Sequence, residues 1–129
     1  MVVVAGICSR NNKLLLSERK EGTHLSGHWE FPGGKVRSGE PPELALAREW
    51  REELGVEVLD PRPWNFAYQP YAEKNILLLF FHIDIQGNPA PQEGQKIAWL
   101  SLEDCHGMNL ADGDRKALDL LTKELETGS

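Results

Sequence analysis

Three acidic side chains of this sequence stand at a spacing that can hold a metal ion. Glu49, Glu52 and Glu53 occupy positions i, i+3 and i+4, so on a helix they share one face. Carboxylates gathered in this way raise one another's pKa unless a cation joins them. Oxygen-only ligands favour Mg²⁺ or Mn²⁺ over zinc, and proteins commonly bind phosphate substrates through such hard cations. The spacing therefore predicts a cation site that serves phosphate chemistry.

An acidic helix can also be a plain solvated face. In that case Glu49 and Glu52 would pair with Arg48 and Arg51, and each pair would contribute a few tenths of a kcal/mol. The functional interpretation is favoured because these residues belong to a longer arrangement of fixed positions. From Gly34 onward it reads G-x5-E-x7-R-E-U-x-E-E-x-G-U, where U is a bulky apolar residue.

The segment that carries the acids is predicted to be one helix. Pro41 and Pro42 suit a first turn, where no intrahelical N–H is required. Residues 43–54 are rich in helix formers, and Gly55 suits a C-terminal stop. A neighbouring arc that can pack inward consists of Leu46, Ala47, Trp50 and Leu54.

Strands are predicted on both sides of this helix. They cover residues 2–8, 13–17, 64–68, 76–85 and 97–100. Asn11 and Asn12 suit a turn between the first two strands. The run 76–81 is apolar on both faces, so this strand should be central and covered on both sides. The order of elements predicts an α/β fold with helices on both faces of a mixed sheet.

Proline and glycine mark the predicted breaks. The Pro-Gly-Gly segment 32–34 indicates a tight turn with unusual backbone angles, and Pro61 and Pro63 indicate a connection between elements. Asp112 or Asp114 can cap a last helix that ends near residue 125. Its apolar stripe is predicted at Ala117, Leu118, Leu121 and Leu125.

The composition is that of a globular protein with a single domain over residues 1–129, at 40% hydrophobic and 26% charged residues. No apolar run approaches the roughly 20 residues that span a membrane, and the apolar start resembles a buried strand more than a signal peptide. We therefore expect a cytoplasmic protein without a membrane partner.

Cys8 and Cys105 show no metal-type spacing and are expected to be reduced thiols. The net charge of −6 argues against a nucleic acid polymer as partner, but not against a nucleotide, because a bound cation reverses the local field.

The stretch from Gly34 to Val56 resembles the complete box of the Nudix hydrolases, with no departure at any fixed position. The resemblance implies an α/β/α sandwich with a mixed sheet between helices. It also implies metal-dependent hydrolysis of a nucleoside diphosphate linked to another group. The implied ligands of Mg²⁺, or of Mn²⁺ in its place, are Glu49, Glu52, Glu53 and the carbonyl of Gly33.

The same resemblance assigns roles around the metal. Arg48 is expected to orient the carboxylates by pairing with Glu49 or Glu52. Glu40 is expected to support the junction of loop and helix. Glu49 is our first choice of general base, and Glu93 is the second.

Two further segments resemble the MutT branch of the family, which hydrolyses oxidised purine nucleoside triphosphates. They are the entry segment 30–35 and the Glu-Gly-Gln segment 93–95. By this match Glu93 joins the metal site and Arg19 faces the phosphates. Phe31 contacts the nucleobase through its backbone, although a place in the core suits it equally. Lys74 stands where the branch has an arginine, which gives any phosphate contact a weaker geometry.

Base recognition is the least determined part of the site. Enzymes of the MutT branch use a side-chain amide or acid just before the last helix, and Asn109 and Asp112 are the candidates here. Asp112 fits the register better. An amide offers a donor and an acceptor, whereas an ionised acid offers acceptors only. Asp112 could accept from guanine, 8-oxoguanine or cytosine, or act in its protonated form.

The resulting hypothesis is hydrolysis of a nucleoside triphosphate to monophosphate and pyrophosphate by a monomer or homodimer. An oxidised purine nucleotide such as 8-oxo-dGTP is the first substrate to consider. Its hydrolysis would remove an oxidised nucleotide from the nucleotide pool. CTP or a modified pyrimidine nucleotide is the main alternative. ADP-ribose, dinucleoside polyphosphates and coenzyme A are further possibilities, and a non-catalytic Nudix-like recognition module is the alternative from another class.

Overall fold

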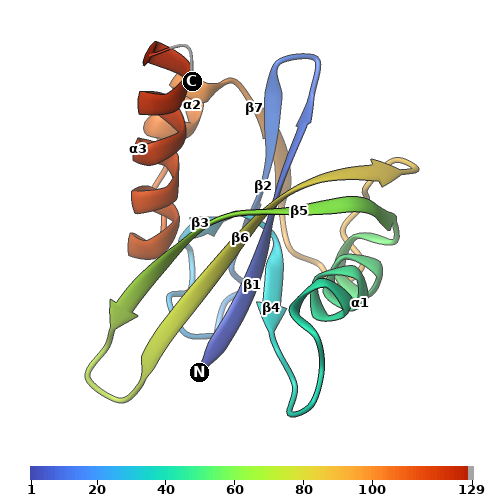
Figure 1. Cartoon of the computed structure of the whole chain (residues 1–129), viewed down its shortest axis with the longest axis vertical. Helices are drawn as coiled ribbons and strands as arrows, with labels where there is room; N and C mark the ends of the chain where they lie inside the picture. Colours follow the sequence, from blue (N-terminus) through green and yellow to red (C-terminus); the bar gives the residue numbers. More distant parts are fainter. Residues whose placement is uncertain (128–129) are drawn as a thin grey trace.

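The computed structural model describes residues 1–127 and is built around a long first strand (Figure 1). Residues 128 and 129 of the expected domain lie outside the described residues. β1 (Val2–Arg10) pairs in parallel with β6 (Asn75–Gln86) and antiparallel with β2 (Lys13–Glu18) and β4 (Gly33–Lys35). β6 pairs with the edge strand β5 (Glu57–Pro70), while β2 also pairs with β3 (Trp29–Glu30) and β7 (Ile97–Leu100).

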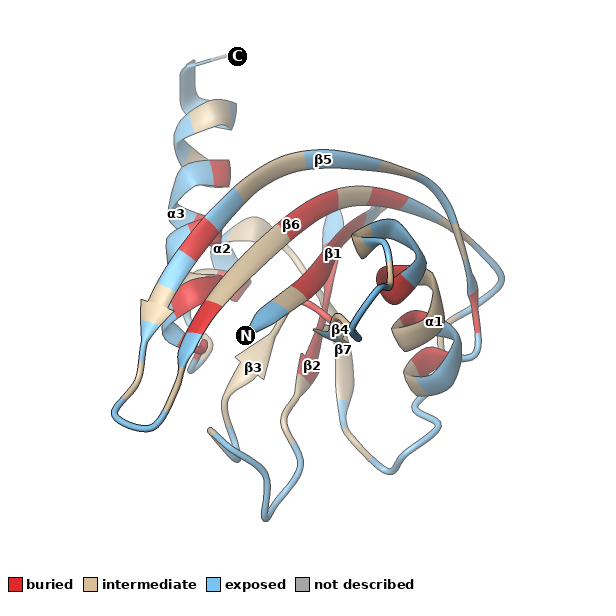
Figure 2. Ribbon diagram, turned by 60° about the horizontal axis from the view of Figure 1, so that its bottom comes forward, coloured by how far each residue is buried: buried red, intermediate tan, exposed pale blue. Residues whose placement is uncertain are grey.

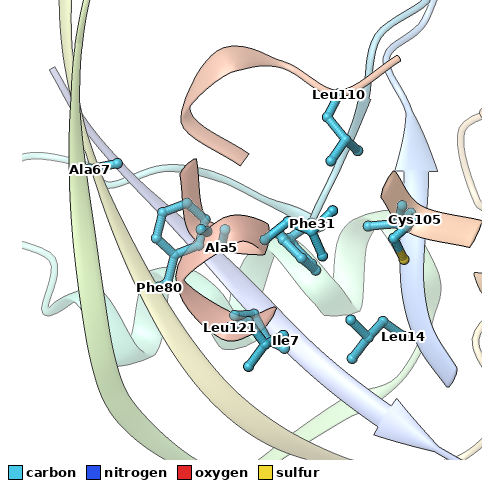
Figure 3. Packing of buried hydrophobic residues seen from close by; sticks show 12 residues of the cluster. Ala5, Ile7, Leu14, Phe31, Ala67, Phe80, Cys105, Leu110 and Leu121 are labelled. Atoms are coloured by element: carbon cyan, nitrogen blue, oxygen red, sulfur yellow. The ribbon is translucent and has the colours of Figure 1, made fainter. Parts of the chain in front are cut away.

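Helices cover both faces of this mixed sheet (Figure 1). α1 (Pro42–Leu54) lies on one side, and α2 (Leu102–His106) and α3 (Asp112–Thr127) lie on the other. One hydrophobic cluster contains Trp50 of α1 and Phe81, and a second contains Leu118 of α3. Figure 3 shows Phe31 and Phe80 in the second cluster. The expected α/β/α sandwich is confirmed.

The apolar run in β6 serves both clusters. Successive side chains of a strand point to opposite faces, so Phe80 packs in the cluster with α3 and Phe81 in the cluster with α1. Figure 2 shows β6 between β1 and the more exposed β5. The prediction that this strand is covered on both sides is confirmed.

Two features predicted from local sequence signals are confirmed: the turn at Asn11 and Asn12 and the end of α1 at Gly55. Asn11 and Asn12 have φ angles of 51° and 61°, the left-handed pair that suits a two-residue hairpin between β1 and β2. Gly55 ends α1 with a φ of 69°, and its N–H donates to the carbonyl of Arg51 at 3.0 Å.

The connection predicted at Pro61 and Pro63 is wrong, because both residues lie inside β5. The register of β5 against β6 is irregular between Leu59 and Arg62 and again between Pro63 and Asn65. Prolines are tolerated on an edge strand and at such irregularities, since no ladder hydrogen bond is needed there.

The stripe predicted for the last helix is correct except at its end. Ala117, Leu118 and Leu121 are buried, whereas Leu125 is 62% exposed. None of the helices within residues 1–127 combines the length and the apolar character needed to cross a membrane.

Candidate functional site

Gly33 and Gly34 bring β4 unusually close to its neighbours. A Cβ atom at Gly33 would overlap the carbonyl of Val4, and one at Gly34 would overlap the carboxyl group of Glu49. Neither glycine has a positive φ, and both belong to β4. The predicted tight turn with unusual backbone angles is therefore wrong: these positions exclude a side chain because of close approach, not because of their torsion angles.

Arg48 connects α1 to the loop before it. Its Nε and Nη2 donate to the two carboxyl oxygens of Glu40, each at 2.9 Å. Its Nη1 donates to Glu49 at 2.7 Å and lies 3.5 Å from Glu52. The hydrogen bonds from Arg48 and from the amide of Arg37 lower the pKa of Glu40 to about 2. Arg48 thus meets both partners proposed from the sequence, and Glu40 has the expected supporting place.

Carboxyl groups from three segments converge around Glu53. Burial is the largest cause that raises the pKa of Glu53 to about 9. The negative charges of Glu49, Glu30 and Glu93 raise it further, and so does a hydrogen bond with Glu49. A carboxyl group held neutral in this way marks a place where a bound cation would be stabilised.

The donors at this place fit a hard divalent cation. Glu49 and Glu53 face a common cleft, and Gly33 lies on its wall. Glu52 is different, because its side chain is 50% exposed and pairs with Arg48. Within residues 1–127, no three or more acidic, histidine or cysteine side chains are placed so that they could hold a metal ion together. Mg²⁺ does not require such a set, because it commonly keeps several waters and is held by one or two carboxylates and the substrate phosphates.

The cleft has a volume of about 290 Å³ and has both apolar and charged walls. Its apolar lining includes Val3, Ile76 and Leu78, and its acidic lining includes Glu49 and Glu53. A smaller hollow of about 170 Å³ shares Glu53 with the cleft and is also lined by Glu93 and Ser17. Apolar walls with a few converging polar groups suit a nucleobase, and a cation site suits its phosphates.

Two cations predicted to face phosphates also line the cleft. Arg19 follows β2 and donates to Glu30 at 3.1 Å and to the carbonyl of His24. Lys74 lies in the turn between β5 and β6. Burial raises the pKa of Glu30, and the opposing charge of Arg19 lowers it in part.

The residues predicted to contact the base are distributed differently. Phe31 is 2% exposed and belongs to the core, and its backbone N–H donates to Asp114 at 3.0 Å. Asn109 and Asp112 are exposed and are not among the residues that line the cleft. The start of α3 instead presents Ala111, Gly113 and Asp114 to it.

Asp114 lines the cleft, and the sequence analysis considered it only as a cap of the last helix. It precedes Ala117, Leu118 and Leu121 at the spacing of the inward helix stripe. An acid on an apolar stripe was the signal that could have identified it.

A NUDIX domain profile matches residues 1–121. The chain belongs to the NUDIX domain family. This Nudix chain is 36% identical over 118 residues to the CTP pyrophosphohydrolase of Escherichia coli (strain K12). The match covers 91% of this chain and 87% of the relative. It is 32% identical over 112 residues to the 8-oxo-dGTP diphosphatase of the same strain, covering 86% and 84%.

The fold agrees with solved Nudix structures. The crystal structure of a MutT NUDIX hydrolase from Burkholderia pseudomallei superposes with a TM-score of 0.85 at 27% identity, over 92% of this chain and 95% of that one. Nudix hydrolases act on small nucleotides and generally need a divalent metal. In this Nudix hydrolase, α1 carries the box residues. The acids that converge at the cleft are the oxygen ligands available to a divalent metal ion.

Proposed function

We propose that this chain is an Mg²⁺-dependent pyrophosphohydrolase of nucleoside triphosphates, with an oxidised purine such as 8-oxo-dGTP as substrate. It would act on the cytoplasmic nucleotide pool as a single domain, in a monomer or homodimer. The observation that carries the proposal is the convergence of Glu49, Glu53 and Glu93 at a cleft that also has apolar walls. The likeness to an 8-oxo-dGTP diphosphatase over 86% of the chain supports the substrate.

The box residues have separate tasks in this reaction. Glu49, Glu52, Glu53 and the Gly33 carbonyl are the proposed metal ligands, with Glu93 as a further one. A bound Mg²⁺ neutralises phosphate charge and lowers the pKa of a coordinated water. Arg48 keeps the Glu49 carboxylate in place through the 2.7 Å contact.

Hydrolysis consumes one water molecule. Its oxygen forms a bond to the β-phosphorus, and the bond from that phosphorus to the oxygen shared with the α-phosphorus breaks, so that this oxygen leaves with the nucleoside monophosphate. Glu49 accepts the proton from the water, with Glu93 as the second candidate for this role. Arg19 and Lys74 are placed to neutralise the phosphate tail. The products are the nucleoside monophosphate and pyrophosphate.

A second candidate substrate is CTP or a modified pyrimidine nucleotide. The likeness to a CTP pyrophosphohydrolase over 91% of the chain favours it, as does the presence of an acid, Asp114, and no amide among the residues of α3 that line the cleft. ADP-ribose, dinucleoside polyphosphates and coenzyme A remain weaker alternatives. A non-catalytic recognition module is disfavoured because every box acid is present.

The deciding experiment is a substrate panel with Mg²⁺, scored by kcat/KM and by product. It contains 8-oxo-dGTP, dGTP, CTP, dCTP, 5-methyl-dCTP, ADP-ribose and a diadenosine polyphosphate. Preference for 8-oxo-dGTP with release of pyrophosphate supports the first proposal, and preference for a cytosine nucleotide supports the second. Turnover of ADP-ribose or the dinucleotide alone would refute both.

The site assignment has its own variant and control. Glu53→Gln should abolish turnover of every substrate, because it removes a charge from the cation site. Glu43→Gln changes an exposed acid in the first turn of the same helix and should leave turnover intact. Equal activity of both variants would show that the metal site is elsewhere.

A further inference from the structure

The last carbonyl groups of α1 are capped by the loop that carries Glu93. A helix leaves its final carbonyls without partners inside the helix. Here the carbonyl of Leu54 accepts the backbone N–H of Ala90 at 3.1 Å, and the carbonyl of Glu53 accepts the backbone N–H of Gln92 at 2.9 Å. The loop between β6 and β7 is therefore attached to the end of α1 (Figure 1).

Gln95 adds a side-chain connection at the same point. Its Nε2 donates to the carbonyl of Glu53 at 2.9 Å, and its Oε1 accepts the backbone N–H of Glu93 at 3.0 Å. Gly94 lies between the two loop residues with a φ of 78°, a left-handed conformation that turns the chain so that the amide reaches back to Glu93. One side chain thus joins the backbone of Glu53 to the backbone of Glu93.

The residues that Gln95 joins carry two of the converging acids. Glu53, Glu93 and Gln95 line the smaller hollow together, and the charge of Glu93 acts on the carboxyl group of Glu53. Glu93 and Gly94 are exposed, whereas Gln95 is half-buried. An exposed loop residue has few packing contacts, so its backbone hydrogen bonds largely decide how firmly it is held. The place of Glu93 near Glu53 therefore depends on Gln95.

An amide suits this connection because it offers a donor and an acceptor at once, whereas an ionised carboxylate offers acceptors only. The carbonyl of Glu53 requires the donor, and the N–H of Glu93 requires the acceptor. Gln92 is a second amide of the same loop, and its Nε2 donates to the carbonyl of Ala90. Within residues 1–127, the side chain of Gln92 has no hydrogen bond to α1, so it provides a matched comparison.

We propose that Gln95 is a positioning residue for the hydrolysis: it fixes Glu93 beside Glu53 and so completes the cation site. The inference rests on the proposed function, which makes Glu93 a metal ligand. Gln95 acts through Glu93 and not on the substrate. Without the Gln95 side chain, the backbone bonds from Ala90 and Gln92 still attach the loop to α1, and only the part that carries Glu93 is released.

Hydrogen exchange and metal binding test this positioning without catalysis. In Gln95→Ala the backbone N–H of Glu93 loses its acceptor, so NMR should show that this amide exchanges about tenfold faster. Mn²⁺ affinity, titrated by electron paramagnetic resonance without nucleotide, should fall by about tenfold, as is common when a group that orients a metal ligand is lost. Gln92→Ala should leave both quantities unchanged, and the two variants should have similar melting temperatures.

A double-mutant cycle separates positioning from a general structural effect. Gln95→Ala should lower kcat by about tenfold and leave KM for the nucleotide unchanged. Because Gln95 acts through the carboxylate of Glu93, adding Gln95→Ala to Glu93→Gln should lower neither kcat nor Mn²⁺ affinity further. Gln95→Glu keeps the acceptor for Glu93 but places an oxygen against the carbonyl of Glu53, so it should be impaired like Gln95→Ala.

Four results would each overturn the proposal. They are unchanged Mn²⁺ affinity in Gln95→Ala, equal effects of Gln92→Ala and Gln95→Ala, unimpaired activity of Gln95→Glu, and effects of Gln95→Ala and Glu93→Gln that multiply in the double variant. The proposed reaction fails separately. The expected exchange and Mn²⁺ results without turnover of any triphosphate would refute the reaction and retain the role of Gln95. Turnover of triphosphates with unchanged Mn²⁺ affinity in Gln95→Ala would do the reverse.

Discussion

The carboxyl group of Glu49 occupies the space where Gly34 would carry a side chain. A Cβ atom at Gly34 would overlap all three carboxyl atoms of Glu49. The strand β4 thus forms a wall against which α1 places its acid, and Arg48 holds the same group from the other side. The position of Glu49, the proposed general base, therefore depends on the absence of a side chain at Gly34 as well as on α1.

Gly34→Ala should therefore lower kcat by about 100-fold, the cost of displacing a catalytic group by about 1 Å. Alanine can adopt the backbone torsion angles of Gly34, whose φ is not positive. The melting temperature should therefore change only slightly, although kcat falls. Gly107→Ala is a suitable control, since a Cβ there would be in ordinary contact with the carbonyl of Asp104. Unchanged turnover in Gly34→Ala would mean that Glu49 is not fixed by this contact.

Arg48→Lys should reduce kcat by about tenfold or more, as is common when a group that orients a metal ligand is lost. Lysine lacks the planar fork that reaches Glu40 and Glu49 at once. Arg51→Lys offers the comparison on the same helix, because Arg51 pairs with Glu57 at the surface. Steady-state kinetics of the two variants should differ clearly, and similar rates would remove the positioning role of Arg48.

The metal-free protein should lose stability as pH rises. The folded-state pKa of Glu53 is raised from its ordinary value of 4.5 to about 9. Its contribution to stability is therefore complete below about 4.5 and is lost as pH rises toward 9. Thermal unfolding in EDTA across this window should show the decline, and Glu53→Gln should flatten it. Added Mg²⁺ should restore stability at the alkaline end, where the carboxylates are charged.

The box helix could be predicted because its information is local. Prolines, helix formers and Gly55 follow one another in the order a helix requires, and the spacing of the acids is read directly from the chain. A mixed sheet with two covered faces was also predicted, from the order of the elements and the apolar run of β6, whereas the short strands β3 and β4 were not.

Features that depend on distant neighbours could not be read in this way. Gly33 and Gly34 suggest a turn by type, and only the approach of Val4 and Glu49 explains them. β5 contains Pro61 and Pro63 because it is an edge strand, a property of the assembled sheet.

The residues that α3 presents to the cleft also depend on distant neighbours. Helix periodicity places Asp114 inward, but the prediction weighed the residues immediately before the helix. Whether Asp112 or Asp114 reaches the cleft depends on how α3 sits against β6, where a Cβ at Gly113 would overlap the side chain of Leu78. That contact joins residues 35 positions apart, which local sequence signals do not describe.

The glycine pair in β4 also constrains how the chain can fold. Val4 lies opposite Gly34 and Ala5 opposite Gly33. A slip of one residue would bring Pro32 or Lys35 into a space that admits no side chain, and it would turn every β4 residue to the other face of the sheet. Misaligned pairings are thus sterically penalised before any substrate is present. Gly33 and Gly34, which line the cleft, therefore also favour the native register between β1 and β4.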